Sequence, residues 1–161
     1  MIPLIKNDTI AYFMGETEVT EGLYAAVSNK TTTKKNYSYE FNSYHTSNTF
    51  VANLNNMINL IFRVPTSKEW QYAAKGGNKS QKYTYSGSNS VSDVAWYSDN
   101  SKRTIHEVAQ LMPNELGFYD MSGNLSEWEV SESNLRGRGG GGFHTGEKWA
   151  SCARQKANPK Y

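Results

Sequence analysis

The residues most suggestive of chemistry lie near the C-terminus, where residues 136–148 have the sequence RGRGGGGFHTGEK. Residues 137–142 fit the spacing GxGxxG, but a dinucleotide-binding loop needs a strand before it and a helix after it, and no helix is indicated here. A P-loop needs lysine directly after its last glycine, whereas Glu147 follows Gly146 and would repel phosphate. An RGG-type arm that binds nucleic acid would repeat the motif, which occurs once. Two interpretations remain: a backbone that turns or closely approaches another strand, and a loop that displays side chains.

Thiol and imidazole groups are few. Cys152 is the only cysteine, so an internal disulfide is excluded, and one thiol cannot provide the paired thiolates that Cu(I) prefers. We expect Cys152 to be a small, partly buried residue in a strand. His45, His106 and His144 do not have the spacing of metal ligands, and each is expected to be a surface or hydrogen-bonded histidine.

The composition indicates one polar, loop-rich domain. The chain has 161 residues, of which 37% are hydrophobic and 20% charged, and this length supports a single core. The net charge of +2 is too small to indicate a nucleic-acid partner. No apolar run reaches membrane-spanning length, and residues 1–5 lack the features of a signal peptide. A cytoplasmic protein and a virion-associated protein both fit these properties.

Apolar periodicity predicts helices in the first half of the chain. A strand is expected at Ile10–Glu16 and a short helix from about Thr17 to Val27, with Val19, Leu23 and Ala26 or Val27 on one face. Residues 28–43 are predicted to form a loop. A second helix follows, started by Ser43, Thr46 or Ser47, whose buried face would contain Phe50, Leu54, Met57, Ile58 and Ile61.

A third helix has the clearest start signal. Thr66 and Glu69 are spaced as a capping box, Trp70, Ala73 and Ala74 would form the buried face, and residues 76–77 would end the helix. A short strand is expected just before it, at residues 62–64. The remainder predicts polar loops with short apolar strands at 94–97, 116–119 and 125–130, so the expected fold class is α+β.

The order of these pieces resembles the formylglycine-generating-enzyme/sulfatase-modifying-factor domain family, a variant of the C-type lectin fold. The stretch FRVPTSKEWQYAAKGG (62–77) is similar to a characteristic segment of that family. Further similarity lies in FMGETEVTEGLYAAV (13–27), VAWYSDNS (94–101), PNELGFYDMSGNLSEWE (113–129), the RGG at 138–140, and Arg154. The resemblance implies one C-type lectin-like domain over residues 1–161.

The resemblance also implies a fold that is reduced at both termini. The N-terminal hairpin of the family is expected to be nearly absent, and its closing C-terminal strand is expected to be missing. The segment between Trp128 and Arg138 is very short. We therefore expect either an unpaired sheet edge or a sheet completed by a partner chain, so that an oligomer is possible.

The family includes enzymes that oxidise a substrate cysteine with copper held by a cysteine pair after the RGG block. Residues 141–149 contain no cysteine, and Cys152 does not lie where the resemblance places the pair. A related branch binds iron through clustered histidines, which this chain lacks. We therefore expect a non-catalytic protein without a cofactor, the alternative being a formylglycine-generating-type oxidoreductase or a degenerate derivative of one.

The same fold family includes the variable proteins of diversity-generating retroelements, which this chain resembles most and whose last segment is hypervariable and binds ligand. By this resemblance, residues 136–161 would form a display segment for a protein or cell-surface ligand, and the gene would be carried by a phage or prophage. Aromatic residues among Ser, Asn and Gly are also typical of antibody paratopes. The displayed positions would be Gly142, Phe143, His144, Glu147 and Trp149.

The family resemblance implies further roles for residues outside that segment. Asn124 and Glu127 would bind a structural calcium ion; alternatively, Glu127 would pair with Arg138 or Arg154. The family has Trp where this chain has Ser126. Trp70, Trp96 and Trp128 are expected in the core, Trp149 fits either the core or the binding face, and Arg63 is expected to pair with an acidic residue.

Overall fold

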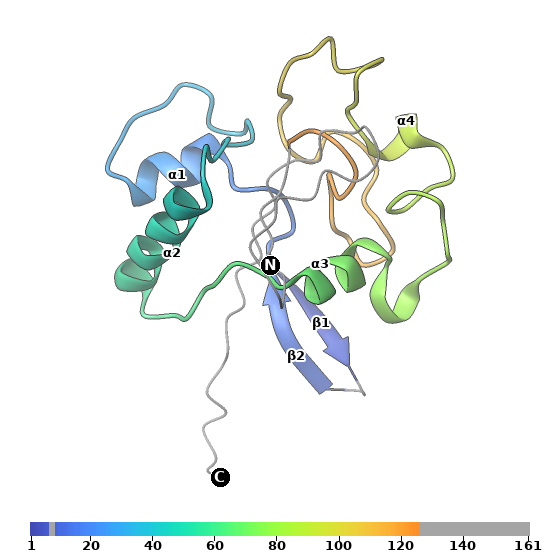
Figure 1. Ribbon diagram of the computed structural model, residues 1–161, viewed down its shortest axis with the longest axis horizontal. Helices are drawn as coiled ribbons and strands as arrows, with labels where there is room; N and C mark the ends of the chain where they lie inside the picture. The colour runs from blue at the N-terminus through green and yellow to red at the C-terminus, as the bar shows by residue number, and fades with distance from the viewer. Residues whose placement is uncertain (7–8, 126–161) are drawn as a thin grey trace.

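The chain begins with an antiparallel hairpin of two strands, β1 (Ile2–Lys6) and β2 (Thr9–Met14). The computed structural model describes residues 1–6 and 9–125, and Figure 1 shows this part in colour. In the hairpin Ile2 lies opposite Met14 and Lys6 opposite Thr9, with an irregularity of register between Leu4 and Ile5. The expectation that an N-terminal hairpin is nearly absent was therefore wrong. Leu4 is buried, and its contribution to a core explains why so short a segment forms a strand.

Helix α1 (Glu21–Val27) begins later than the sequence predicted. Residues before it stay extended because the backbone at Thr20 pairs with Ser38, and the Thr20 hydroxyl then accepts a hydrogen bond from the Leu23 amide at 3.2 Å. Ala25 and Val27 are buried, whereas Leu23 is exposed. The predicted buried face was wrong at Leu23, because the helix packs against α2 through a neighbouring face.

Helix α2 (Tyr44–Ile58) starts at Ser43, one of the three predicted caps, which forms a capping box with Thr46. Phe50 and Leu54 are buried as expected, but Met57, Ile58 and Ile61 are exposed, with 59%, 44% and 58% of their surface accessible. The helix ends at Ile58 because Asn59 adopts a left-handed conformation with φ 50°. The chain turns there, so Phe62 rather than Ile61 enters the core.

The segment after α2 is fixed by a side chain rather than by a strand. The Asn55 amide donates to the Phe62 carbonyl at 3.0 Å, and its oxygen accepts from the Phe62 amide at 2.6 Å. These two bonds satisfy the Phe62 backbone, and the strand predicted at residues 62–64 does not form. Phe62 closes a first hydrophobic core between α1 and α2.

Helix α3 (Ser67–Ala74) begins with the predicted capping box. The Glu69 amide donates to the Thr66 hydroxyl at 3.3 Å, and the Thr66 amide donates to the Glu69 carboxylate at 2.9 Å. Arg63 pairs with the same carboxylate at 2.6 Å, which confirms the prediction of an acidic partner. Ala73 is fully buried in a second core with residues of the hairpin and of the later loops: Leu4, Met14, Phe118 and Met121.

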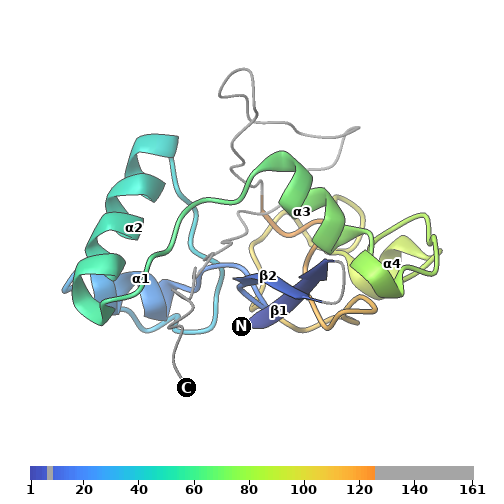
Figure 2. The same ribbon diagram turned by 90° about the horizontal axis from the view of Figure 1, so that it is seen from below.

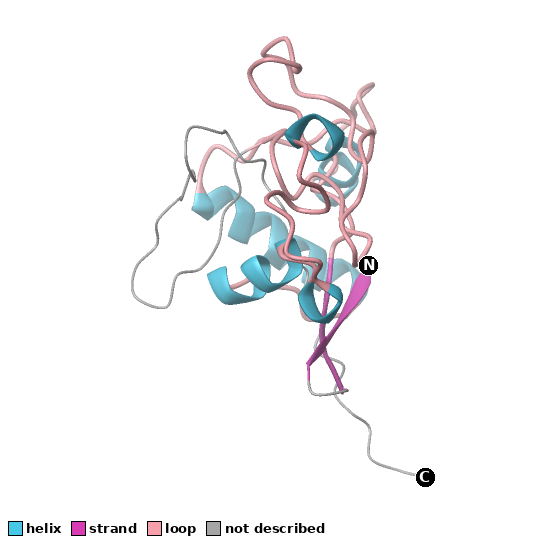
Figure 3. Cartoon of the chain, turned by 90° about the vertical axis from the view of Figure 1, so that its right-hand side faces the viewer, coloured by secondary structure: helices cyan, strands magenta, loops and turns pink. Residues whose placement is uncertain are grey.

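The remaining regular structure in the described residues is the 3₁₀ helix η1 (Gly77–Lys79) and the single turn α4 (Val91–Val94). Loops make up most of this half of the chain (Figure 3). The strands predicted at 94–97 and 116–119 do not form, because side chains satisfy the backbone there instead. Asn114 is the clearest case, since its oxygen accepts from the amides of Leu116 and Phe118 and its Nδ2 donates to the Ala73 carbonyl at 2.8 Å.

The described residues thus form two groups of elements. Figure 2 shows α1 and α2 on one side and α3 and α4 on the other, with the hairpin between them. Each group contributes to its own core, and the described chain passes from the hairpin to α1 through residues 15–20.

We expect Glu69→Gln to lower the free energy of unfolding by roughly 0.5–1 kcal/mol near pH 7 and to have little effect near pH 3. Burial alone would raise the pKa of the Glu69 carboxyl, but hydrogen bonds from Arg63 and Thr66 outweigh it and lower the pKa below its ordinary 4.5. A lowered folded-state pKa contributes stability above the unfolded-state pKa, and this is lost as the pH falls through the folded-state value. Gln keeps the capping acceptor, so the difference measures the charge together with the Arg63 hydrogen bond that the Gln amino group cannot accept.

Urea denaturation at a series of pH values measures this effect, with Glu40→Gln, outside α3, as the control. If Glu69→Gln lowers the free energy of unfolding by the same amount at pH 7 and at pH 3, the ionised Glu69 carboxylate is not the stabilising group.

Candidate functional site

A buried polar cluster joins three distant segments of the chain at Glu18, Ser38 and Asn124. Glu18 precedes α1, Ser38 lies in the loop after it, and Asn124 comes from the last described loop. The Asn124 Nδ2 donates to a Glu18 carboxylate oxygen at 2.7 Å and to the Ser38 hydroxyl at 2.8 Å. The Ser38 hydroxyl in turn donates to the same Glu18 oxygen. Because Glu18 and Asn124 are 106 residues apart, this cluster fixes the late loop against the start of α1.

Glu18 is the anionic centre of the cluster. Its residue is only 2% exposed, and a carboxylate at that depth is stable only when donors replace the lost water. The donors come from Ser38, from Asn124, and from the backbone amide of Leu125, which bonds the second oxygen at 3.3 Å. Glu18 therefore holds the backbone at Leu125 as well as the side chain of Asn124.

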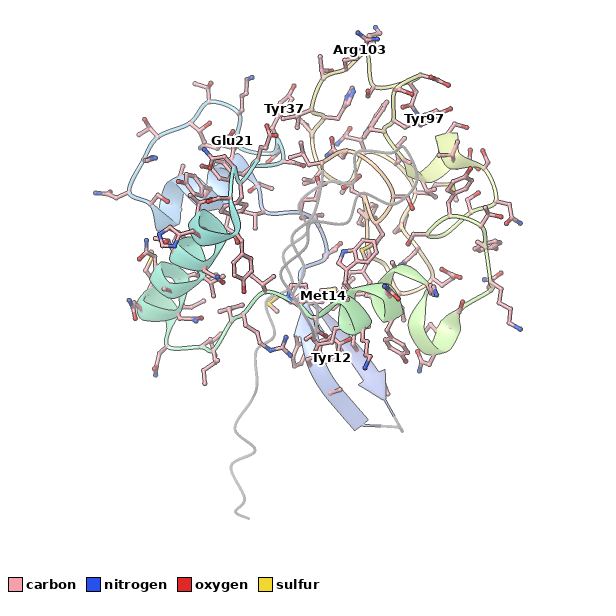
Figure 4. The ribbon with its side chains drawn as sticks, in the orientation of Figure 1. Tyr12, Met14, Glu21, Tyr37, Tyr97 and Arg103 are labelled. Carbon is pink, nitrogen blue, oxygen red and sulfur yellow. The ribbon has the colours of Figure 1, made fainter. Side chains whose placement is uncertain are left out.

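The backbone beside Glu18 is held by a short stretch of pairing between the start of α1 and the loop at residues 35–39. The Glu21 amide donates to the Tyr37 carbonyl at 2.7 Å, and the Tyr39 amide donates to the Val19 carbonyl at 2.8 Å. Figure 4 shows Glu21 and Tyr37 lying close together at this edge of the molecule. The two bonds place Ser38 opposite Thr20 and so bring its hydroxyl to Glu18.

His106 and Trp96 form the second layer of the cluster. The rings stack with centroids 3.9 Å apart and planes 12° apart. The His106 backbone amide donates to the Asn124 side-chain oxygen at 3.1 Å. Its Nε2 lies 3.0 Å from the Ser101 carbonyl, which can only accept, so Nε2 carries the proton. The prediction that His106 is hydrogen-bonded is confirmed, and His45 is exposed, as expected of a surface histidine.

Two residues with positive φ let the last loop reach this position. Gly123 has φ 98°, and a Cβ there would lie 2.3 Å from the Trp96 carbonyl oxygen. Asn124 has φ 63°, and its amide donates to the same Trp96 carbonyl at 2.9 Å. Glycine and asparagine are the residues that tolerate such conformations. The SGN sequence at residues 122–124 is therefore required by the close approach of the two backbones.

Most of the predicted site lies outside the described residues. Glu127, Trp128 and Cys152 are among them, as are all five predicted display positions: Gly142, Phe143, His144, Glu147 and Trp149. The structure describes the chain up to Leu125, and these predicted positions stay predictions.

Asn124 is the one predicted metal ligand that the structure describes. Its side-chain amide hydrogen-bonds to Glu18, Ser38 and the His106 backbone, so both ends of the amide already have protein partners. Across residues 1–6 and 9–125, no three His, Cys, Asp or Glu side chains are grouped as metal ligands. Calcium binding by Asn124 with Glu127 stays a prediction.

Trp70 lies against a core, as the sequence predicted, whereas Trp96 belongs to neither core of the described residues and stacks on His106 instead. Trp70 packs against the second core, and both rings are partly exposed. The indole nitrogen of each is buried without a hydrogen-bond partner.

Sequence reasoning missed Glu18 and Ser38. For Glu18 the available signal was an acidic residue beside the apolar Val19, at a position where a solvent-facing helix was predicted instead.

The described helices are also too short or too polar to cross a membrane.

We expect Asn124→Asp to lower the free energy of unfolding by about 3 kcal/mol or more near pH 7. The substitution replaces the Nδ2 donor by a second carboxylate oxygen beside buried Glu18. Two adjacent carboxylates raise the pKa of one of them, so the deficit should shrink at acidic pH, where protonation restores a donor. Urea denaturation at neutral and acidic pH measures both effects.

Asn89→Asp is the matched control. Asn89 is exposed, and its side-chain oxygen accepts from the Thr84 amide at 3.0 Å, a bond that Asp can keep. This variant should stay within about 0.5 kcal/mol of the natural protein. Equal stability of the two variants would show that Glu18 does not depend on the Asn124 amide.

Comparison with solved structures identifies the fold. Variable protein 1 of Treponema denticola superposes with a TM-score of 0.70 at 23% sequence identity, covering 94% of this chain and 86% of that one. At that level of identity the likeness concerns the fold alone. The fold is the α+β, C-type lectin-like fold of the formylglycine-generating-enzyme type that the sequence predicted.

Two curated relatives share part of the sequence. The chaperone protein LppX of Paenibacillus barcinonensis is 41% identical over 107 residues, which is 51% of this chain and 38% of that protein. The inactive C-alpha-formylglycine-generating enzyme 2 of Bos taurus is 31% identical over 80 residues, 44% of this chain and 27% of that protein. The chain therefore spans well under half the length of either relative.

A shorter match of another kind occurs with one component of the NADH-quinone oxidoreductase of Rhizobium meliloti. It is 59% identical over 32 residues, but these are 8% of that protein. So small a share transfers no activity. Family assignment depends on the far longer match, in which residues 3–160 align with the sulfatase-modifying factor enzyme 1-like domain. The chain belongs to the family of sulfatase-modifying factor enzyme 1-like domains.

Proposed function

We propose that this protein is a non-catalytic ligand-binding protein that displays residues 136–161 on a C-type lectin-like scaffold. The observation that carries the proposal is the single cysteine of the chain. Oxidation of a substrate cysteine with Cu(I) needs a pair of soft thiolate ligands, and Cys152 alone does not form one. The domain thus keeps the fold of this family without the ligand pair of its enzymes.

The anchoring cluster supports the display role. A segment that tolerates many residues must start from a fixed point, since otherwise each change would disturb the core beneath it. Glu18 bonds the Leu125 amide from a position that is almost fully buried, and Asn124 holds the preceding residue. Neither contact uses a side chain from residues 136–161, so substitutions in that segment leave both contacts in place.

The names of three similar proteins are consistent with a non-catalytic role. One curated relative is named as inactive, another as a chaperone, and a solved protein of the same fold as variable. None of these names describes turnover. The ligand we propose is a protein or a cell-surface molecule, bound by displayed aromatic and polar side chains, and we propose a phage or prophage origin for the gene.

We expect the five display positions to be replaceable together without loss of the fold. In a variant with Gly142→Ser, Phe143→Ala, His144→Ala, Glu147→Ala and Trp149→Ala, the free energy of unfolding should change by less than about 1 kcal/mol, as at exposed positions. Phe118→Ala, in the second core, should cost about 3–5 kcal/mol and serves as the control. Thermal unfolding, monitored by circular dichroism, compares the stability of the five-fold variant with that of Phe118→Ala. If the five-fold variant is as unstable as Phe118→Ala, the segment packs inside and the display role fails.

The genomic context tests the retroelement origin. A near-copy of the codons for residues 136–161 should lie close to the gene, differ from it at adenines, and accompany a reverse transcriptase. Its absence would leave an ordinary binding module of the same fold.

The oxidoreductase alternative predicts conversion of a cysteine-containing peptide by the copper-loaded protein. We expect none, because the ligand pair is incomplete. Conversion by the natural protein that disappears in Cys152→Ser would overturn the non-catalytic proposal, and mass spectrometry of the peptide detects it.

A further inference from the structure

A pocket is lined by the C-terminal half of α3, by the loop at residues 80–86, and by the later loops at residues 115 and 121–122. Its volume is about 430 Å³, within the range of small-molecule sites. Its lining includes Trp70 and Ala74 of α3, Tyr83 and Tyr85 of the loop, and Met121 and Ser122.

The loop that covers the pocket is anchored at both ends, so the pocket is preformed. The Gln81 amide donates to the Glu115 carboxylate at 2.8 Å, and the Ser86 amide donates to the Ser122 hydroxyl at 3.2 Å. The buried Asn114 amide also donates to the Ser86 hydroxyl at 3.0 Å. A ligand therefore need not order this loop, which removes one cost of binding.

The charged side chains at the pocket favour an anion. Lys75 and Lys82 both line it, and neither ammonium group has a carboxylate within ion-pair distance among the described residues. The one acidic residue in the lining, Glu115, already accepts the Gln81 amide. Within the described part of the chain, the lining thus has two ammonium groups without a carboxylate partner. Its single carboxylate, that of Glu115, accepts a backbone hydrogen bond, so positive charge is in excess at the pocket.

The apolar part of the lining favours a flat ligand. Trp70, Tyr83 and Tyr85 provide aromatic surface, and the Tyr83 hydroxyl is held by the Gln81 side chain at 2.8 Å. Rings placed in this way stack on other rings and lose little conformational entropy on binding.

We propose that this pocket binds a small aromatic carboxylate, with the ring against the aromatic side chains and the carboxylate toward Lys75 and Lys82. The site is independent of the display segment, because all of its named residues lie between 70 and 122. Its function therefore does not depend on the binding function proposed above.

The test uses the full-length protein labelled with ¹⁵N and titrated with benzoate to roughly 20 mM, above the millimolar Kd expected of so small a ligand. The indole N–H resonance of Trp70, assigned with Trp70→Phe, should shift and saturate. The indole resonance of Trp96, which does not line the pocket, should stay in place and is the internal control. Absence of a saturable shift at Trp70 would overturn the proposal.

Matched ligands separate charge from shape. Benzamide has the same ring without the charge, and acetate has the charge without the ring, so each should bind at least about five-fold more weakly than benzoate. Equal binding of benzamide would overturn the anionic assignment, and equal binding of acetate would overturn the aromatic one.

Matched variants test the cationic groups. Lys75→Gln with Lys82→Gln should weaken benzoate binding about ten-fold. The control variant, Lys79→Gln with Lys102→Gln, makes the same change in net charge at exposed lysines outside the pocket and should leave the Kd unchanged. Equal effects of the two double variants would show that only the net charge matters and that the pocket is not the site.

Discussion

The contact between the Glu18 carboxylate and the Asn124 amide is the interaction on which this structure depends. The described residues contain two separate cores, one between α1 and α2 and one between the hairpin, α3 and the later loops. Met14 belongs to one core and Val19 to the other, and Glu18 lies between them in the sequence. Its buried hydrogen bonds to Ser38 and Asn124 therefore connect both cores with polar groups, whose geometry is more directional than that of apolar contacts.

Asparagine side chains replace strands in much of the second half of the fold. Asn114 and Asn124 each use both ends of the amide, and each satisfies backbone or side-chain groups more than 15 residues away. Such a residue can hold irregular loops at fixed distances without a hydrogen-bonded ladder. The same property makes the fold sensitive, because an amide oriented by its partners on both sides cannot be replaced by a carboxylate without losing donors.

Local signals predicted part of this structure and long-range contacts determined the rest. The Thr66–Glu69 capping box and the start of α2 were predictable because each depends on residues three positions apart. The burial of Ile61 was predicted wrongly because periodicity continues past Asn59 whereas the helix does not, and Met57 and Ile58 are exposed in the last turn of α2. The role of Glu18 was not predictable, since its partners Ser38 and Asn124 are 20 and 106 residues away.

The long-range contacts that fix the last described loop also affect how freely a binding segment after it can vary. The residues that hold the last described loop are Glu18, Ser38, Gly123 and Asn124, and all of them precede Leu125. Glu18, Ser38 and Asn124 hydrogen-bond one another, and Asn124 also bonds the backbone of Trp96 and His106. None of these contacts uses a side chain from residues 136–161, so substitutions there leave them in place. The positions that hold this loop are thus separate in the sequence from residues 136–161, the segment that we propose to vary.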